Sequence, residues 1–271
     1  MDPVDGKIVS RPGRPLYDRI GIGYDATRRA DPGLAGELHD HLGPACGPIL
    51  DLACGTGNYS AALSDRGRCM IGLDRSPQML AQARLKGAEP RVLADAARLP
   101  FAPATFTGAI CIHAVHHFAD LRAALAEVGR VLAPAARLVI FTGFPDQVRS
   151  YWLNAYFPRA LERAADLVPS EIEIAQALAA AGFEPPVVLP WQVAPDLSDL
   201  FMYAGKQRPE LYFDAAVHRS ISTFANLATA AEVEDGLARL RADLDAGRFE
   251  TIAAGYGSTV GDYSFMIAGK A

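Results

Sequence analysis

From Pro48 onward, short apolar runs alternate with segments of helical periodicity, and this alternation constrains the fold more than any other feature of the sequence. Such alternation predicts βα units, whose strands lie side by side in a parallel sheet. We expect strands at 48–52, 69–73, 91–94, 108–112 and 137–142, and less regular ones at 186–193 and 261–269. The sequence therefore predicts an open α/β domain with seven mostly parallel strands and helices on both faces.

The second half departs from regular alternation. Residues 147–168 are expected to be helical, with a kink or break at Pro158, and about 65 mostly helical residues separate the last two strands. An insertion of this size between two edge strands has to sit over one end of the sheet. We expect N-terminal lid helices over 1–45, a core over 46–145, a segment completing the core over 146–195, a helical lid insertion over 196–258 and a final strand over 259–271.

Composition disfavours several classes of function. The 271 residues carry 26 Lys and Arg against 31 Asp and Glu, a net charge of −5, whereas proteins that grip nucleic acid usually have a basic excess. The first fifteen residues lack the apolar region of a signal peptide, and the longest uncharged stretch, 101–119, contains a proline and three histidines. The four cysteines show no metal-ligand spacing. We expect a soluble cytoplasmic protein without a bound metal.

The segment ILDLACGTGNYS, residues 49–60, carries the strongest chemical pattern. An apolar strand containing Asp51 leads into a tight turn with Gly55 and Gly57, and glycines let a backbone approach a ligand closely. A dinucleotide-binding GxGxxG loop would need glycine where this chain has Ser60, and a phosphate-binding P-loop would need a lysine. An ordinary strand–helix turn is the alternative interpretation.

Acidic residues close the next two strands. Asp74 follows Gly57 by 17 positions, where a carboxylate can accept hydrogen bonds from both hydroxyls of a ribose. A helix-capping role is the alternative, but Ser76 already occupies the capping position. Asp95 closes the third strand in the same way. Together these residues predict a nucleoside pocket without a pyrophosphate cradle.

Four segments, DLACGTGNYS, GLDRSPQMLAQAR, ADAARLPF and HAVHHF, occur in this order within residues 48–142. They resemble the ordered motifs of class I S-adenosylmethionine-dependent methyltransferases of the small-molecule type. The upstream segment YDRIGIGYDATRRADP resembles the tyrosine-rich N-terminal region of such enzymes, and the likeness fades after Phe144. The resemblance implies a Rossmann-like fold and S-adenosyl-L-methionine as cofactor.

The resemblance also implies roles for individual residues. Asp51 and the glycines would surround the methionine portion of the cofactor, Asp74 would hold the ribose hydroxyls, and Asp95 would accept from the adenine amino group. One departure concerns Thr107, where many relatives carry Asp. The full cofactor-binding set is Tyr17, Asp51, Ala53, Gly55, Gly57, Asn58, Asp74, Arg75, Met79, Asp95, Ala96 and Cys111.

Histidines and tyrosines are the candidates for catalysis. His113 and His116 follow a strand end, at the edge where α/β domains bind ligands, and an imidazole can take a proton near neutral pH. The alternative is that they cap the next helix or line the cofactor. Tyr24 is a further catalytic and substrate-binding candidate in the N-terminal segment, where packing of a lid helix is the competing interpretation.

Aromatic and cationic residues of the second half are candidates for substrate binding. An aromatic wall can stack a flat substrate, and an arginine can pair with a carboxylate, although helix core and solvated surface are the alternatives. The predicted substrate-binding set is Tyr24, His113, His116, Tyr151, Trp152, Tyr156, Tyr203, Arg208 and Arg219.

The sequence favours a methyltransferase that acts on a nitrogen, oxygen or activated carbon of a small organic molecule, as a monomer or homodimer. A tRNA or rRNA methyltransferase is the alternative of the same fold. The alternative from another functional class is a protein that binds the cofactor without transferring a methyl group, such as a regulator or a cyclase. A nicotinamide dehydrogenase is disfavoured because Ser60 replaces the third glycine.

Overall fold

The computed structural model describes residues 27–44, 46–86 and 90–271 of the chain. Its strands form one seven-stranded sheet in the order β3-β2-β1-β4-β5-β7-β6. Neighbouring strands are parallel except at β7, which runs antiparallel to both β5 and β6. The strands are β1 (Pro48–Leu52), β2 (Cys69–Asp74), β3 (Arg91–Leu93), β4 (Phe106–Ile112), β5 (Leu132–Thr142), β6 (Val187–Trp191) and β7 (Tyr263–Gly269). The predicted Rossmann-like, mostly parallel sheet is confirmed.

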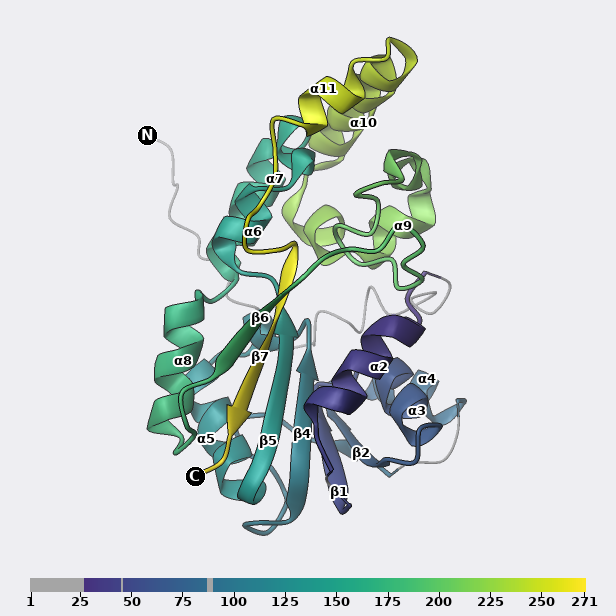
Figure 1. Cartoon of the computed structure of the whole chain (residues 1–271). Coiled ribbons are helices and arrows are strands. Elements are labelled where there is room, and N and C mark those ends of the chain that lie inside the picture. The colour runs from purple at the N-terminus through teal and green to yellow at the C-terminus, as the bar shows by residue number, and fades with distance from the viewer. Residues whose placement is uncertain (1–26, 45, 87–89) are drawn as a thin grey trace, which may run out of the picture.

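Helices cover both faces of this sheet (Figure 1). On one side lie α2 (Pro32–His41), α3 (Asn58–Ser64) and α4 (Pro77–Arg84), and on the other lie α5 (Leu121–Val131) and α8 (Glu171–Ala180). Two apolar cores result, one containing buried side chains of α2 and α3 and the other those of α5 and α8. The sheet is therefore enclosed on both faces, as its continuous apolar strands require.

Capping side chains fix where helices begin after the strands. Ser76 Oγ accepts from the backbone N–H of Met79 at the start of α4, and Asp120 accepts from Ala123 N at the start of α5. Each bond satisfies one of the N–H groups that a helix start leaves without an intrahelical partner. The first turns of α4 and α5 are therefore held by side chains of the preceding residues.

One strand begins earlier than predicted, and one proline breaks a helix as predicted. Pro134 lies inside β5, which begins at Leu132 rather than at 137, because the pairing with β4 shifts register between Phe106 and Gly108. An irregularity of this kind removes a ladder bond and so tolerates a proline. Pro158 begins α7 (Pro158–Leu167) instead of kinking a longer helix, since the first helical turn needs no N–H from that residue.

Further helices gather beyond the carboxyl ends of the parallel strands (Figure 1). After β5 come α6 (Pro145–Arg149), η3 (Trp152–Ala155) and α7. Between β6 and β7 come η4 (Pro209–Phe213), α9 (Ala215–Ser220), η5 (Thr223–Leu227), α10 (Ala230–Asp245) and α11 (Phe249–Ala253). We call residues 145–167 and 194–258 the helical cap. Its apolar core is continuous with that of α2 and α3, and its role as a lid stays a prediction.

The contact between α5 and α8 leaves no room for a side chain at Gly129. An added Cβ would lie 2.4 Å from the backbone oxygen of Ala181. We expect Gly129→Ala to lower the free energy of unfolding by about 1–3 kcal/mol, because one of the two elements has to shift. Gly36→Ala on α2 is the control, since its Cβ meets no described atom within 4 Å, and we expect a gain of up to about 1 kcal/mol. Urea unfolding of both variants measures the difference; equal values would contradict the packing.

Candidate functional site

The turn between β1 and α3 is built from residues in the left-handed backbone region. Ala53, Gly55 and Gly57 have φ values of 59°, 56° and 71°. A Cβ added at Gly55 would meet no described atom within 4 Å, whereas one at Gly57 would lie 3.0 Å from Arg91. The turn therefore presents an open surface at Gly55 and close packing at Gly57. Ala53 holds a conformation that disfavours side chains, which is a local strain at the turn.

Asp51 is buried and receives a hydrogen bond from Ser60 Oγ (2.6 Å). Ser60, which departs from a dinucleotide-binding pattern, thus connects the strand before the turn to the helix after it. Sequence reasoning placed Asp51 in the cofactor site, and the structure places it directly beneath the turn.

Asp74 closes β2 beside the same turn. Its Oδ2 accepts from Gly55 N (2.9 Å) and its Oδ1 from Ser76 N (2.8 Å), so a single carboxylate shapes the turns after β1 and β2. Burial raises the pKa of Asp74, while backbone N–H groups of Ser76, Gly55 and Arg75 act in the opposite sense. Each carboxylate oxygen has a further lone pair with which to accept from a ligand.

The other residues predicted for the nucleoside lie at the ends of β2 and β3. Met79 and Ala96 are buried, whereas Arg75 and Asp95 are exposed. Asp95 Oδ1 accepts from the backbone N–H of Ala97 (2.9 Å). Thr107 lies elsewhere, at the amino end of the sheet, where its hydroxyl bonds to the backbone of Gly47 and Pro48.

The end of β4 brings an imidazole under the helical cap. Cys111 is buried, and burial raises the pKa of its thiol, so it behaves as a small apolar side chain. His113 adopts a φ of 50°, and its ring contacts those of Phe141, Phe201 and Tyr263 at centroid distances of 4.9, 4.5 and 5.1 Å. Its Nε2 is buried and has no hydrogen-bond partner among the described residues. Burial lowers the pKa of His113 well below its ordinary value.

His116 lies in the short helix η2 (Val115–His117), with its ring 4.0 Å from that of His117. Burial lowers the pKa of His116 to about 4, and its Nδ1 has no partner in the part of the chain that the structure describes. Both His113 and His116 are therefore neutral at pH 7. Whether either one acts in catalysis stays a prediction.

The predicted aromatic wall forms the interior of the helical cap. Tyr151 stacks on Tyr203 at 3.8 Å and donates to the backbone oxygen of Asp262. Trp152 Nε1 donates to Lys206 O (3.0 Å), and Tyr156 is buried on the cap side. These contacts support packing roles, and the substrate-binding role of the four aromatic residues stays a prediction.

The cationic candidates differ in setting. Arg208 donates to the carbonyl oxygen of Leu197 (2.7 Å), so a carboxylate would have to compete with that bond. Arg219 is exposed in the last turn of α9. Tyr17 and Tyr24 lie outside the described residues.

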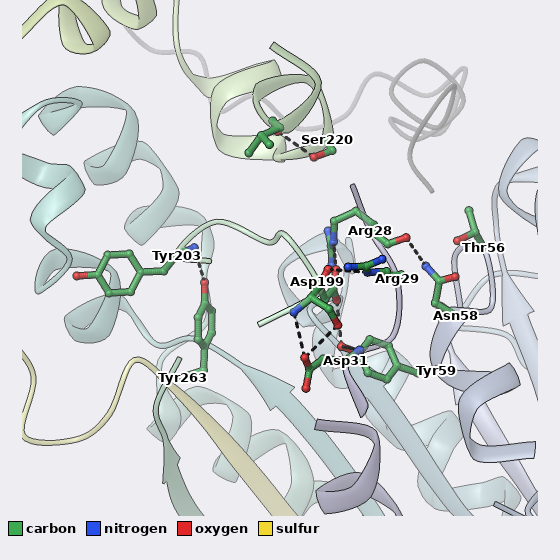
Figure 2. Close-up of polar contacts among 12 residues, drawn as sticks. Arg28, Arg29, Asp31, Thr56, Asn58, Tyr59, Asp199, Tyr203, Ser220 and Tyr263 are labelled. Atoms are coloured by element: carbon green, nitrogen blue, oxygen red, sulfur yellow. Dashed lines mark hydrogen bonds and ion pairs between the residues drawn. The ribbon is translucent and has the colours of Figure 1, made fainter. Parts of the chain in front are cut away.

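Sequence reasoning missed a buried cluster that joins three distant parts of the chain (Figure 2). Asp199, 2% exposed, forms an ion pair with Arg28 Nε (2.5 Å) and accepts from Tyr59 OH (3.0 Å). Asn58 Nδ2 donates to Arg28 O (2.9 Å), and Asp31 Oδ2 accepts from Ser198 N (3.0 Å). We call these contacts the Asp199 cluster. Asn58 belongs to the cofactor-binding set predicted from the sequence, but no local pattern marks Asp199 as part of this site.

Two surface hollows lie away from these residues. One of about 400 Å³ is bordered by Leu42, Thr107 and Arg137, and one of about 370 Å³ by Tyr156, Glu232 and Arg239. Neither is lined by the glycine turn, Asp74 or His113. The glycine turn, Asp74 and His113 lie instead at the carboxyl ends of β1, β2 and β4, which is where open α/β sheets usually bind ligands.

Comparisons with known proteins bear on this arrangement. Residues 50–140 match a family model described as a methyltransferase domain. The demethylmenaquinone methyltransferase of Corynebacterium kroppenstedtii is 34% identical over 166 residues, 58% of this chain and 72% of that protein. A crystal structure from Anabaena variabilis, described as a methyltransferase from an antibiotic biosynthesis pathway, superposes with a TM-score of 0.79 at 31% identity, covering 89% of this chain and 98% of that one.

The chain belongs to the class I S-adenosylmethionine-dependent methyltransferases, of the small-molecule type. Phosphoethanolamine N-methyltransferase 2 of Haemonchus contortus, solved with S-adenosylhomocysteine, shares the fold at a TM-score of 0.60 and 16% identity, over 94% of this chain and 58% of that one. The chain spans 59% and 54% of the lengths of two further demethylmenaquinone methyltransferases. S-adenosylmethionine is the cofactor of the 271-residue protein itself.

Within the described ranges, no group of three His, Cys, Asp or Glu side chains is arranged to hold a metal ion. No helix among the same residues is both long enough and apolar enough to cross a membrane. The features that distinguish this site are the glycine turn, the Asp74 carboxylate and the buried Nε2 of His113.

The lowered pKa of His116 predicts a pH dependence of stability. In the unfolded chain a histidine binds a proton near pH 6.5, but in the folded protein His116 binds one only near pH 4. Between these values the unfolded state holds more protons, so the free energy of unfolding falls as the pH falls, by up to about 1.4 kcal/mol per pH unit from this group. We expect His116→Gln to make the loss of stability between pH 6.5 and 4.5 shallower, as measured by urea unfolding; an unchanged slope would contradict the assignment.

Proposed function

We propose that the protein transfers the methyl group of S-adenosylmethionine to a nitrogen, oxygen or activated carbon of an uncharged small organic molecule. One observation carries this proposal: an open glycine turn, the Asp74 carboxylate and the His113 imidazole, with its buried Nε2, lie at the carboxyl ends of the neighbouring strands β1, β2 and β4. Relatives named demethylmenaquinone methyltransferase and O-methyltransferase support an acceptor of small size.

The residues present fit the cofactor. The open surface at Gly55 leaves space that a Cβ would fill, so the backbone of 53–57 is suited to the methionine portion. Asp74 Oδ2 accepts from Gly55 N and Oδ1 from Ser76 N, and an ionised carboxylate has about four acceptor sites, so the group can also accept from ribose hydroxyls. Met79, Asp95 and Ala96 would border the adenine. These assignments are proposals that follow from position and donor chemistry.

When bound, the cofactor supplies an electrophilic methyl group on a sulfonium, so the protein has to provide alignment and a dry environment. Phe141, Phe201 and Tyr263 surround His113 with apolar ring surface. Neutral His113 offers a buried nitrogen to an acceptor N–H or O–H, either to orient that group or to take its proton.

Charge pairing inside the protein favours an uncharged acceptor. Arg28 is paired with Asp199, Lys206 with Asp262 (2.8 Å), and the guanidinium of Arg208 donates to a carbonyl oxygen. A substrate carboxylate would have to break one of these contacts, and breaking a buried ion pair leaves an uncompensated charge. The aromatic surroundings of His113 suit a planar, neutral ring instead.

Loss of the Asp74 charge should weaken cofactor binding. We expect Asp74→Asn to raise the dissociation constant of S-adenosylhomocysteine about tenfold or more, because hydrogen bonds to a charged acceptor contribute roughly 1.5–3 kcal/mol. Asp120→Asn is the matched control, since it removes a capping carboxylate at a helix remote from the turn. Isothermal titration with S-adenosylmethionine, S-adenosylhomocysteine and NAD measures the effect. Binding of NAD alone would overturn the proposal.

Removal of the His113 imidazole should affect transfer more than cofactor binding. Asn tolerates the left-handed backbone at this position, so His113→Asn is the suitable variant. With uncharged ring acceptors we expect S-adenosylhomocysteine formation to fall about 10²-fold or more if the imidazole takes a proton, at an unchanged affinity for the cofactor. A variant as active as the wild type would show that His113 only fills space, and turnover of carboxylate-bearing acceptors alone would contradict the proposed substrate class.

A further inference from the structure

The Asp199 cluster links the cofactor side of the molecule to the acceptor side. We propose that Asp199 is a positioning residue: it holds residues 27–31 against the helix that follows the glycine turn and holds Phe201 against His113, so that cofactor binding and the acceptor wall are coupled. This inference rests on the proposed function. Asp199 lies between β6 and β7 and belongs to none of the sequence motifs.

On the cofactor side, the contacts reach the first turn of α3. Tyr59 OH donates to Asp199 Oδ2 (3.0 Å), and the preceding residue, Asn58, donates through Nδ2 to Arg28 O (2.9 Å). Asn58 directly follows Gly57, the last glycine of the turn. Arg28 and Asp199 therefore contact the structure that would hold the methionine portion of the cofactor (Figure 2).

On the acceptor side, the same loop carries Phe201. Its ring lies 4.5 Å from that of His113, and the Arg28 guanidinium lies 5.9 Å from the ring centroid of Phe201. Leu200 N donates to Thr27 O (3.1 Å), which adds a backbone hydrogen bond between residues 198–201 and residues 27–31. Asp199 therefore lies two residues before Phe201, whose ring contacts that of His113.

The burial of Asp199 and Arg28 makes their ion pair costly to break. Asp199 is 2% exposed and Arg28 is 13% exposed, so separating them in place would leave each charge without water and without its partner. Asp31 adds a second link, because Ser198 donates to its Oδ2 through both N and Oγ at 3.0 Å. These contacts hold residues 27–31 and 198–201 together, so a ligand that stabilises one segment also stabilises the other.

The test uses full-length protein and S-adenosylhomocysteine as the probe. Affinity is measured by isothermal titration, and amide hydrogen exchange is followed in peptides covering 194–204, with and without the probe. For the wild type we expect binding and probe-dependent protection of 194–204. For Asp199→Asn we expect a dissociation constant raised about fivefold or more and loss of that protection.

Asp262→Asn is the matched control. Asp262 is also buried and also paired with a cation, Lys206. It accepts a backbone N–H from Val193, and these contacts do not reach α3. We expect this variant to lose thermal stability while keeping wild-type affinity and protection. If both variants lowered affinity equally, Asp199 would have only a general structural role and the inference would be overturned.

The remaining outcomes also decide the question. A wild type that binds no S-adenosylhomocysteine would remove the proposed function together with this inference. A wild type that binds, with Asp199→Asn unchanged in affinity and protection, would overturn the inference alone. Should Asp199→Asn not fold, Tyr59→Phe takes its place, because it removes the hydroxyl that joins α3 to Asp199 and to the backbone N–H of Asp31 and leaves the Arg28–Asp199 pair intact. It should raise the dissociation constant and reduce protection, and no change would overturn the inference.

Discussion

The reversal of strand order at β1 and β4 is the constraint on which the whole site depends. From β1 the sheet extends through β2 and β3 in one direction and through β4 and β5 in the other. The turns that follow β1 and β4 therefore lead to opposite faces and leave room between them at the carboxyl edge. Asp74 lies at this edge at the end of β2, His113 follows the end of β4, and the helical cap lies above the edge (Figure 1).

The fold and the positions of Asp51, Gly55 and Asp74 at the strand ends could be predicted because their determinants are local. A strand, a glycine turn and a helix are encoded within residues 49–60, and an acidic residue at the next strand end follows from periodicity. The structure adds what pattern alone does not contain, namely that Ser60 supports Asp51 and that Asp74 binds the backbone of Gly55. Residue type predicted the location of these groups but not their partners.

The acceptor half could not be predicted to the same depth, because its determinants are distant in sequence. Arg28 and Asp199 are 171 positions apart, and neither lies in a pattern that would announce the other. Tyr151 and Trp152 were predicted as substrate-binding residues, yet hydropathy cannot distinguish the interior of a helical cap from the wall of a pocket. Loops positioned by a rigid sheet commonly carry the residues that determine substrate specificity. Their conformation depends on tertiary packing, which a local sequence motif does not encode.

The position of β7 has a consequence for the order in which the chain folds. This strand is the last in the sequence but lies between β5 and β6, with Phe141 opposite Phe265 and Val188 opposite Met266. Until it inserts, β6 has no partner in the sheet and β5 keeps an open edge. Pairing of residues so far apart is slowed by loop-closure entropy. The sheet is therefore completed only after the entire cap has been synthesised, and an incompletely made chain exposes an apolar edge that favours aggregation.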